Sequence, residues 1–266
     1  MNRMELKKIE HSVKIGDECP MLQPNITEDS IFYDNGEVIG FYMNQLPKLM
    51  QKYITIANAE LLSVRVPKQE MSRGPQGSKK DKLKRARDGV TLVTQYSTIL
   101  GSVPPKPHMR RNYPTRSSVH SVTTARHFIK SMFLACLEAE KLINKIAPDV
   151  YQKQKQTVEE NVPSKWRFGN LFTSSISNFN IAARYHRDNA NLKNCVNVII
   201  TKRRNAEGGN TTVPDYGATV DSCDNSILVY PAWRNTHGVT PIIPLKTKGY
   251  RNSMVFYALK AFKNYE

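Results

Sequence analysis

The sequence has few cysteines, no long apolar run and too few acids to balance its basic residues. Its four cysteines are scattered without a C-x-x-C pair, which excludes a zinc finger by spacing and predicts reduced thiols. No stretch approaches the roughly 18 apolar residues that a membrane span needs. Residues 1–10 are charged and lack the apolar core of a signal peptide. We therefore expect a cytoplasmic protein without a membrane partner.

Basic residues dominate the charge, with 39 Lys and Arg against 23 Asp and Glu and a formal net charge of +16. A field of this sign attracts nucleic acid, although a generally basic surface is the alternative. Residues 72–116 carry eleven Lys or Arg and only two Asp. Their Gly- and Pro-rich runs favour loops, so this segment is either a solvated surface or an arm along a phosphate backbone. We expect Arg110, Arg111 and Arg116 to contact DNA, and the 79–87 run to matter less.

The hydrophobic pattern predicts an α+β protein of one domain, 1–266. A helix is expected near 44–58, a strand over 61–66 and a long helix over 122–147, where apolar residues recur every three or four positions. Short apolar runs between turns then predict a sandwich or jelly-roll barrel. The predicted strands of this part are 172–179, 196–201, 219–220, 226–230 and 253–261. We interpret 1–160 as a basic, helix-rich half that supports a catalytic β half, 161–266.

Two histidines and an aspartate are candidate metal ligands. His186 and Asp188 are two residues apart, so on an extended segment they project from the same face. His237 follows 51 residues after His186, beyond an apolar strand. Two histidines and one carboxylate from separate strands form the facial triad of non-haem Fe(II) oxygenases. Zinc hydrolases also use such sets, more often as H-E-x-x-H or three histidines.

Arg251 and Ser253 form a candidate carboxylate site on one strand face. The guanidinium of an arginine can bind a carboxylate in a bidentate manner, and a hydroxyl two residues on adds a donor. A hydrolase needs no such site, whereas an enzyme whose metal chelates 2-oxoglutarate must hold the far carboxylate of that cosubstrate. The alternative is a structural arginine paired with a surface acid.

Three motifs together resemble the TET/JBP family of 2-oxoglutarate/Fe(II)-dependent nucleic-acid oxygenases, the TET branch in particular. The resemblance covers roughly residues 165–262. The motifs are His186-Arg-Asp-Asn-Ala-Asn191, which is similar to H-R-D-x-x-N, His237-Gly-Val-Thr-Pro241, which is similar to H-x-x-T-P, and Arg251-Asn-Ser-Met-Val-Phe-Tyr257, which is similar to R-x-S-x-V-F-Y.

The resemblance implies a double-stranded β-helix (a jelly-roll, cupin-like barrel) with supporting helices, acting as a monomer on DNA with a flipped methylated base. It implies that Fe(II) is bound by His186, Asp188 and His237, and that 2-oxoglutarate, which is used with O2, is bound by Arg251 and Ser253, with Arg116 as a further candidate. On the substrate side it implies Asn191, Val255 and Tyr257, of which Asn191 hydrogen-bonds the base and Tyr257 stacks on it. The implied reaction converts 5-methylcytosine to 5-hydroxymethylcytosine, with further oxidation left open.

Two positions depart from the animal TET pattern: Ala190 and Leu259 stand where those enzymes have histidines. The cysteine-rich zinc-binding region of the animal enzymes is also missing, so we expect no structural zinc. The small size of the chain fits a viral enzyme, such as one from a bacteriophage working in the host cytoplasm. The alternatives are oxidation of thymine, N-alkylated bases or protein side chains, and a nucleic-acid-binding β-barrel with an inert metal site. Repair of N-alkylated bases of the AlkB type is disfavoured, because that pattern has an arginine where this chain has Tyr257.

Overall fold

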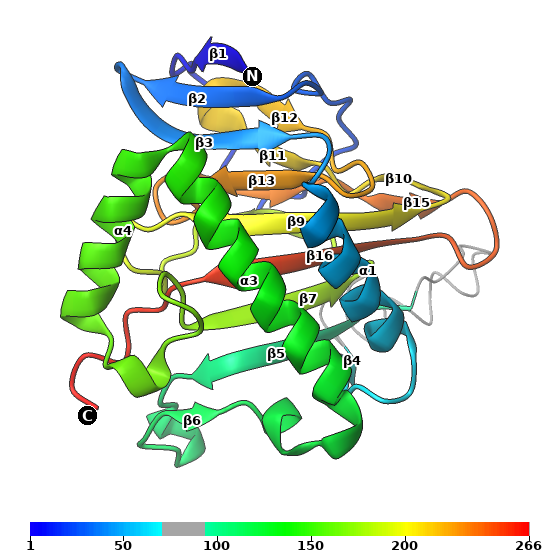
Figure 1. The fold of residues 1–266 in the computed structure, drawn as a ribbon. Helices are drawn as coiled ribbons and strands as arrows, with labels where there is room; N and C mark the ends of the chain where they lie inside the picture. Colours follow the sequence, from blue (N-terminus) through cyan, green and yellow to red (C-terminus); the bar gives the residue numbers. More distant parts are fainter. Residues whose placement is uncertain (71–93, 266) are drawn as a thin grey trace.

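One large, mostly antiparallel sheet organises the computed structural model, which describes residues 1–70 and 94–265 (Figure 1). The spatial order of its strands is β1-β2-β3-β13-β9-β16-β7-β5-β4, and β6 pairs with β5. The basic run at 79–87 lies outside the described residues. The strands are β1 (Asn2–Glu5), β2 (Ser30–Asp34), β3 (Glu37–Met43), β4 (Gln69–Glu70), β5 (Tyr96–Val103), β6 (Thr115–Arg116), β7 (Ser174–Phe179), β9 (Asn197–Arg204), β13 (Ile227–Tyr230) and β16 (Tyr250–Tyr257).

A smaller four-stranded sheet, in the order β12-β11-β14-β8, faces the large one across a cavity that residues of both sheets line. A two-stranded ribbon of β10 and β15 completes this side. The arrangement is the predicted α+β fold with a jelly-roll core. The strands of this side are β8 (Ala183–His186), β10 (Ala206–Gly208), β11 (Thr211–Val213), β12 (Ala218–Val220), β14 (His237–Val239) and β15 (Ile242–Pro244).

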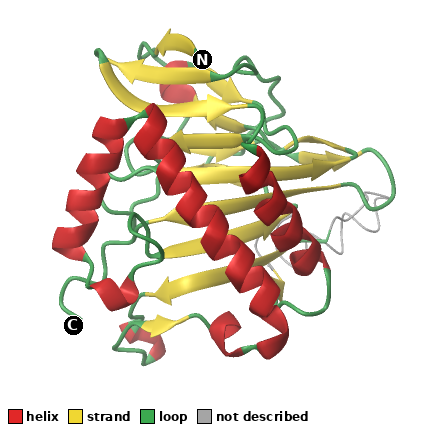
Figure 2. Cartoon of the chain, viewed as in Figure 1, coloured by secondary structure: helices red, strands yellow, loops and turns green. Residues whose placement is uncertain are grey.

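Helices α1 (Lys48–Leu62), α3 (Arg126–Ile146) and α4 (Pro148–Asn161) cover the other face of the large sheet (Figure 2). The predicted periodicity is confirmed in α3, where Phe128 and Met132 are fully buried in the main core. None of the helices in the described ranges is long and apolar enough to cross a bilayer. Short 3-10 helices occur at η1 (Pro107–Met109), η2 (Ser118–Ser121), η3 (Thr123–Ala125), η4 (Ser164–Trp166) and η5 (Pro214–Tyr216).

The predicted strand over 61–66 is wrong. Leu61 belongs to α1, where it continues the buried stripe of Ile54 and Ala57, and the chain then turns. The predicted 253–261 strand begins and ends earlier, at Tyr250–Tyr257. The first half also contributes strands to the large sheet, since β3 pairs with β13 and β5 with β7. The two halves therefore share one sheet.

A buried carboxylate fixes the segment that leads into β7, one wall of the cavity. Glu140 of α3 is 3% exposed and accepts hydrogen bonds from the backbone N–H groups of Asn170 (2.6 Å) and Leu171 (2.9 Å) and from the Asn170 amide (2.7 Å). Gly169 precedes them with a positive φ of 72°, and a Cβ there would collide with the Glu140 carboxylate. The hydrogen bonds of Glu140 thus hold this segment against α3.

We expect Glu140→Ala to lower the free energy of unfolding by roughly 2–4 kcal/mol, because it leaves buried N–H groups without an acceptor. Urea denaturation followed by circular dichroism measures the loss. Glu138→Ala is the matched control on the same helix: Glu138 forms only a surface pair with Lys141 (2.8 Å), and its loss should cost less than about 1 kcal/mol. Equal losses in the two variants would contradict the role of Glu140.

Candidate active site

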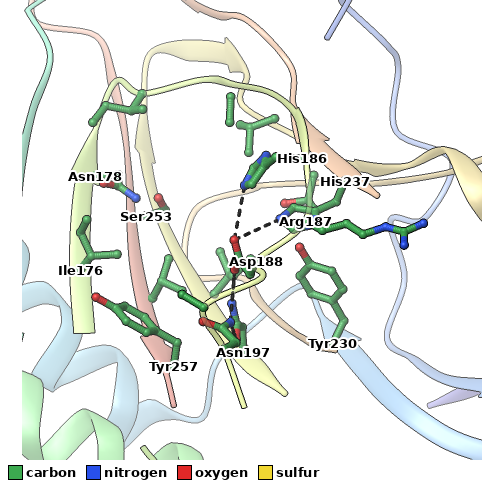
Figure 3. Close-up of a pocket in the computed structure, with 18 of the residues that line it drawn as sticks. Ile176, Asn178, His186, Arg187, Asp188, Asn197, Tyr230, His237, Ser253 and Tyr257 are labelled. Carbon is green, nitrogen blue, oxygen red and sulfur yellow. Dashed lines mark hydrogen bonds and ion pairs between the residues drawn. The ribbon is translucent and has the colours of Figure 1, made fainter. Parts of the chain in front are cut away.

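Two histidines and an aspartate converge at one side of the cavity between the sheets (Figure 3). His186 ends β8, His237 begins β14, and the antiparallel register places them directly opposite each other with ring centroids 4.3 Å apart. Asp188 follows β8 in a loop, where its N–H donates to the Ala232 carbonyl (3.2 Å). One ligand atom from each side chain lies within 4.8 Å of the others. The structure thus brings the three predicted ligands together.

Backbone carbonyls orient both imidazole rings. His186 Nδ1 lies 2.7 Å from the Arg184 carbonyl oxygen, and His237 Nδ1 lies 3.1 Å from that of Asn235. Because a carbonyl only accepts, each Nδ1 carries a proton, and Nε2 is the nitrogen of each ring that is left for a metal. The Nε2 atoms of His186 and His237 point to Asp188 Oδ1, at 3.5 and 4.0 Å. Two nitrogen donors and one oxygen donor facing one point fit a non-haem Fe(II) ion.

The second oxygen of Asp188 is held by amides. Asp188 Oδ2 accepts from Asn197 Nδ2 (2.8 Å) and Asn191 Nδ2 (3.3 Å), which leaves Oδ1 for a metal. Burial opposes ionisation of Asp188, but its hydrogen bond with His186 and the nearby imidazoles lower its pKa. Burial also lowers the pKa of His237 to about 4. Near pH 7 the aspartate is therefore charged and His237 is neutral. The contact with Asp188 raises the pKa of His186, so this imidazole must give up its proton when it binds a metal.

The alternating residues of β16 line the opposite wall. Arg251, Ser253, Val255 and Tyr257 all face the cavity, which has a volume of about 550 Å³. The sequence predicts the shared face for Arg251 and Ser253, and the structure extends it to Val255 and Tyr257. Asn191 lines the same cavity from the loop that follows Asp188. Strand alternation alone therefore arranges these four side chains in one row, from Arg251 to Tyr257.

Arg251 is a buried cation without a carboxylate partner among the described residues. The side chain is 1% exposed, its Nη2 contacts only Ser222 Oγ at 3.4 Å, and its Nε has no hydrogen-bond partner. Burial, with a smaller effect of the Arg203 charge, lowers the pKa of Arg251 to about 9. Arg203 itself pairs with Asp221 at 3.4 Å. A buried guanidinium that faces a cavity and lacks an anion fits the far carboxylate of 2-oxoglutarate.

None of the three predicted DNA-contacting arginines lines this cavity. Arg116 is in β6, where its guanidinium donates to Ser102 Oγ (3.1 Å) and to the Lys165 carbonyl, and it does not line the cavity. The structure does not place Arg116 near Arg251, where a second residue that binds 2-oxoglutarate would have to lie. Arg110 and Arg111 are exposed on the loop before β6.

Several cavity residues were not anticipated from the sequence, among them Ile176, Asn178, Asn197 and Tyr230. Figure 3 shows Ile176 and Asn178 beside Ser253 and Tyr257, and Tyr230 on the side of the histidines. The Tyr230 hydroxyl is buried with no hydrogen-bond partner in the described part of the chain. These residues belong to no motif. Only the alternation along β7 could have indicated that Ile176 and Asn178 share a face.

A jelly roll that holds this donor set beside a buried arginine defines a 2-oxoglutarate/Fe(II)-dependent oxygenase. The sequence is more specific, because the Tet_JBP family, the oxygenase domain of the 2OGFeDO superfamily, matches residues 105–260, and the chain belongs to this family. Its cofactors are accordingly Fe(II), 2-oxoglutarate and O2.

One solved structure shares the fold at low sequence identity, and a second matches less well. NgTET1 in complex with 5mC DNA is 14% identical with a TM-score of 0.59, over 95% of this chain and 84% of that one. A full-length protein of Neurospora crassa, solved in complex with alpha-KG, is 10% identical with a TM-score of 0.42, over 82% of this chain and 74% of that one. A search of curated protein sequences finds no match for this chain.

We expect Arg251→Ala to weaken 2-oxoglutarate binding by about 2–5 kcal/mol, because the carboxylate loses its charge-assisted partner. Calorimetric titration of the anaerobic Fe(II)-loaded protein measures the change. The matched control is Arg203→Ala, which removes the same charge from the neighbouring position on β9 and should have a much smaller effect. An unchanged dissociation constant in Arg251→Ala would contradict the assignment.

Proposed function

We propose that this protein hydroxylates the methyl group of 5-methylcytosine in DNA to give 5-hydroxymethylcytosine. Membership of the Tet_JBP family supports an oxygenase, and the structural neighbour NgTET1 was solved with 5mC DNA. The net charge of +16 suits a polyanionic substrate. The orientation of Asn191 supports cytosine as the base.

The chain's own residues bind and orient the reactants. His186, Asp188 and His237 would hold the iron through Nε2, Oδ1 and Nε2, and Arg251 with Ser253 would hold 2-oxoglutarate. Iron, 2-oxoglutarate and O2 supply the oxidising power that inserts one oxygen atom into a C–H bond, with succinate and carbon dioxide as the products of the cosubstrate. The substrate methyl must reach this point, so the base has to leave the stack of the duplex. Tyr257 and Val255 offer the wall against which a flipped base can lie.

The Asn191 amide presents an acceptor to the cavity. Its Nδ2 donates to Asp188 Oδ2 (3.3 Å) and to Asn197 Oδ1 (2.8 Å), which uses both amide protons. The ionised Asp188 carboxylate only accepts, so the amide cannot be flipped without losing this contact. Asn191 Oδ1 makes no hydrogen bond with any described residue and remains free for a ligand.

This acceptor distinguishes the two methylated pyrimidines. Next to the C5 position, cytosine carries the N4 amino donor, whereas thymine carries the O4 acceptor. A base whose 5-methyl points to the metal ligands places this neighbouring group close to Asp188 and Asn191. The amino group of 5-methylcytosine can donate to Asn191 Oδ1, while O4 of thymine would face it without a proton between them. The geometry therefore favours 5-methylcytosine over thymine.

We expect the wild-type protein to oxidise 5-methylcytosine in preference to thymine in otherwise identical duplexes, and Asn191→Ala to reduce that preference. Loss of the one acceptor removes the discrimination, which is worth about 1–3 kcal/mol for a good hydrogen-bonded base contact. Mass spectrometry of nucleosides after incubation with Fe(II) and 2-oxoglutarate measures both products. A wild type that prefers thymine would overturn the proposed substrate. If the protein formed no succinate from 2-oxoglutarate, the alternative of a nucleic-acid-binding protein with an inert metal site would remain.

We expect Tyr257→Ala to reduce oxidation of DNA through lost base stacking, by about 1–3 kcal/mol in transition-state free energy. Tyr257→Phe is the matched control, since it keeps the ring and should retain most of the activity. The measurement is kcat/KM for duplexes that contain 5-methylcytosine. If Phe and Ala at this position gave equal rates, Tyr257 would have no stacking role.

A further inference from the structure

We propose that a basic groove beside the active-site cavity binds the sugar-phosphate backbone of the DNA substrate. The groove has a volume of about 430 Å³, and Lys68, Lys106, Arg111, Arg116 and Ser117 are among its lining residues. This inference rests on DNA being the substrate, as proposed above, and concerns a surface that is separate from the metal and 2-oxoglutarate sites.

The groove lies along β5 at the edge of the large sheet and reaches the face that lines the cavity. Ile176 of β7 lines the cavity, and Ile99 of β5 lines the groove. The antiparallel register places Ile99 directly opposite Ile176, so both side chains project from the same face. Neighbouring strands are about 4.8 Å apart. A strand of DNA in the groove therefore lies next to the place where its flipped base would enter.

The charge of the groove is uncompensated. Among the described residues that line it, four are cationic and none is acidic. Within the described ranges, none of these four cations forms an ion pair with a carboxylate. Burial lowers the pKa values of Lys68 and Arg116, because a partly enclosed surface removes water from their charges. A polyanion is the ligand that such a surface favours.

A buried hydroxyl provides an independent reason to expect a ligand. Ser117 is 6% exposed, lines the groove, and its Oγ has no hydrogen-bond partner among the described residues. An unpaired buried hydroxyl costs stability unless a ligand or water satisfies it. Ser118 and Thr115 add further hydroxyls to the lining. Serine, threonine, lysine and arginine are the side chains that commonly contact phosphate oxygens.

The cations are held on ordered backbone. Lys106 and Arg111 close a tight loop, in which Lys106 N–H donates to the Arg111 carbonyl (2.6 Å) and Arg111 N–H donates to that of Lys106 (3.2 Å). Arg116 is fixed by its bonds to Ser102 and the Lys165 carbonyl. Arg110, in the same loop with a φ of 55°, does not line the groove. The structure thus selects Arg111 and Arg116 and adds Lys68 and Lys106 to the expected phosphate contacts.

The test compares two double variants with the same loss of charge. Lys106→Gln with Arg111→Gln alters the groove, and Lys52→Gln with Lys130→Gln alters exposed positions of α1 and α3 on the opposite side of the large sheet. Binding of an unmodified duplex is measured by fluorescence anisotropy over a series of salt concentrations. The slope of the logarithm of the association constant against log[salt] is negative, and its magnitude decreases by about 0.9 for each phosphate contact that is lost. The groove variant should therefore have a slope whose magnitude is smaller by close to two.

The control pair should keep the wild-type slope, and both variants should keep the wild-type dissociation constant for 2-oxoglutarate, which shows that they are folded. Equal slopes in the groove variant and the control pair would contradict the proposed binding of DNA by the groove. Because unmodified DNA needs no oxidation, this outcome is distinct from failure of the proposed reaction, which would appear as missing 5-hydroxymethylcytosine in the wild type.

Discussion

The pairing of β8 with β14 is the constraint on which the active site depends. It sets His186 opposite His237, and a slip of one residue would turn one ring to the other face of the small sheet. The carbonyls of Arg184 and Asn235 then fix which nitrogen of each ring remains free. The metal donors are therefore positioned mainly by backbone, and the chain needs only a short loop to add Asp188.

In the proposed reaction, Asp188 would link metal binding to base recognition. One carboxylate oxygen faces the histidines, and the other organises Asn191 and Asn197. The same charge that favours iron thus determines which end of the Asn191 amide faces the cavity. A neutral residue at this position would free the amide to rotate and present a donor. Under the proposed function, selectivity for a base and affinity for a metal would be coupled through the two oxygen atoms of Asp188.

Local patterns in the sequence predict much of this site and miss the rest for identifiable reasons. The period of two along β16 was enough to place Arg251, Ser253 and Tyr257 on one face. Asn197 and Tyr230 are brought into the cavity by pairing between β9 and β13, which is non-local and has no motif. The strand predicted over 61–66 fails for a local reason. The short apolar run at 61–66 indicates a strand, whereas Leu61 is the last residue of a buried helical stripe that begins at Met50. Charge density suggests Arg116 as a phosphate contact, and its candidate role at 2-oxoglutarate is not met, because charge carries no information on the direction in which a side chain points.

The length of β16 explains how one strand serves two ligands. Successive residues on a strand advance by about 3.3 Å, so the six steps from Arg251 to Tyr257 span roughly 20 Å. That distance leaves room for a small dicarboxylate at the buried end and a pyrimidine at the other, with the metal ligands of the facing sheet between them. Because the two ends are farther apart than the range over which substitutions usually interact, base recognition can change while the cosubstrate site stays the same. Ala190 and Leu259, which differ from the animal pattern, both line the cavity, as Tyr257 does. Arg251 and Ser253, in contrast, match the family pattern R-x-S.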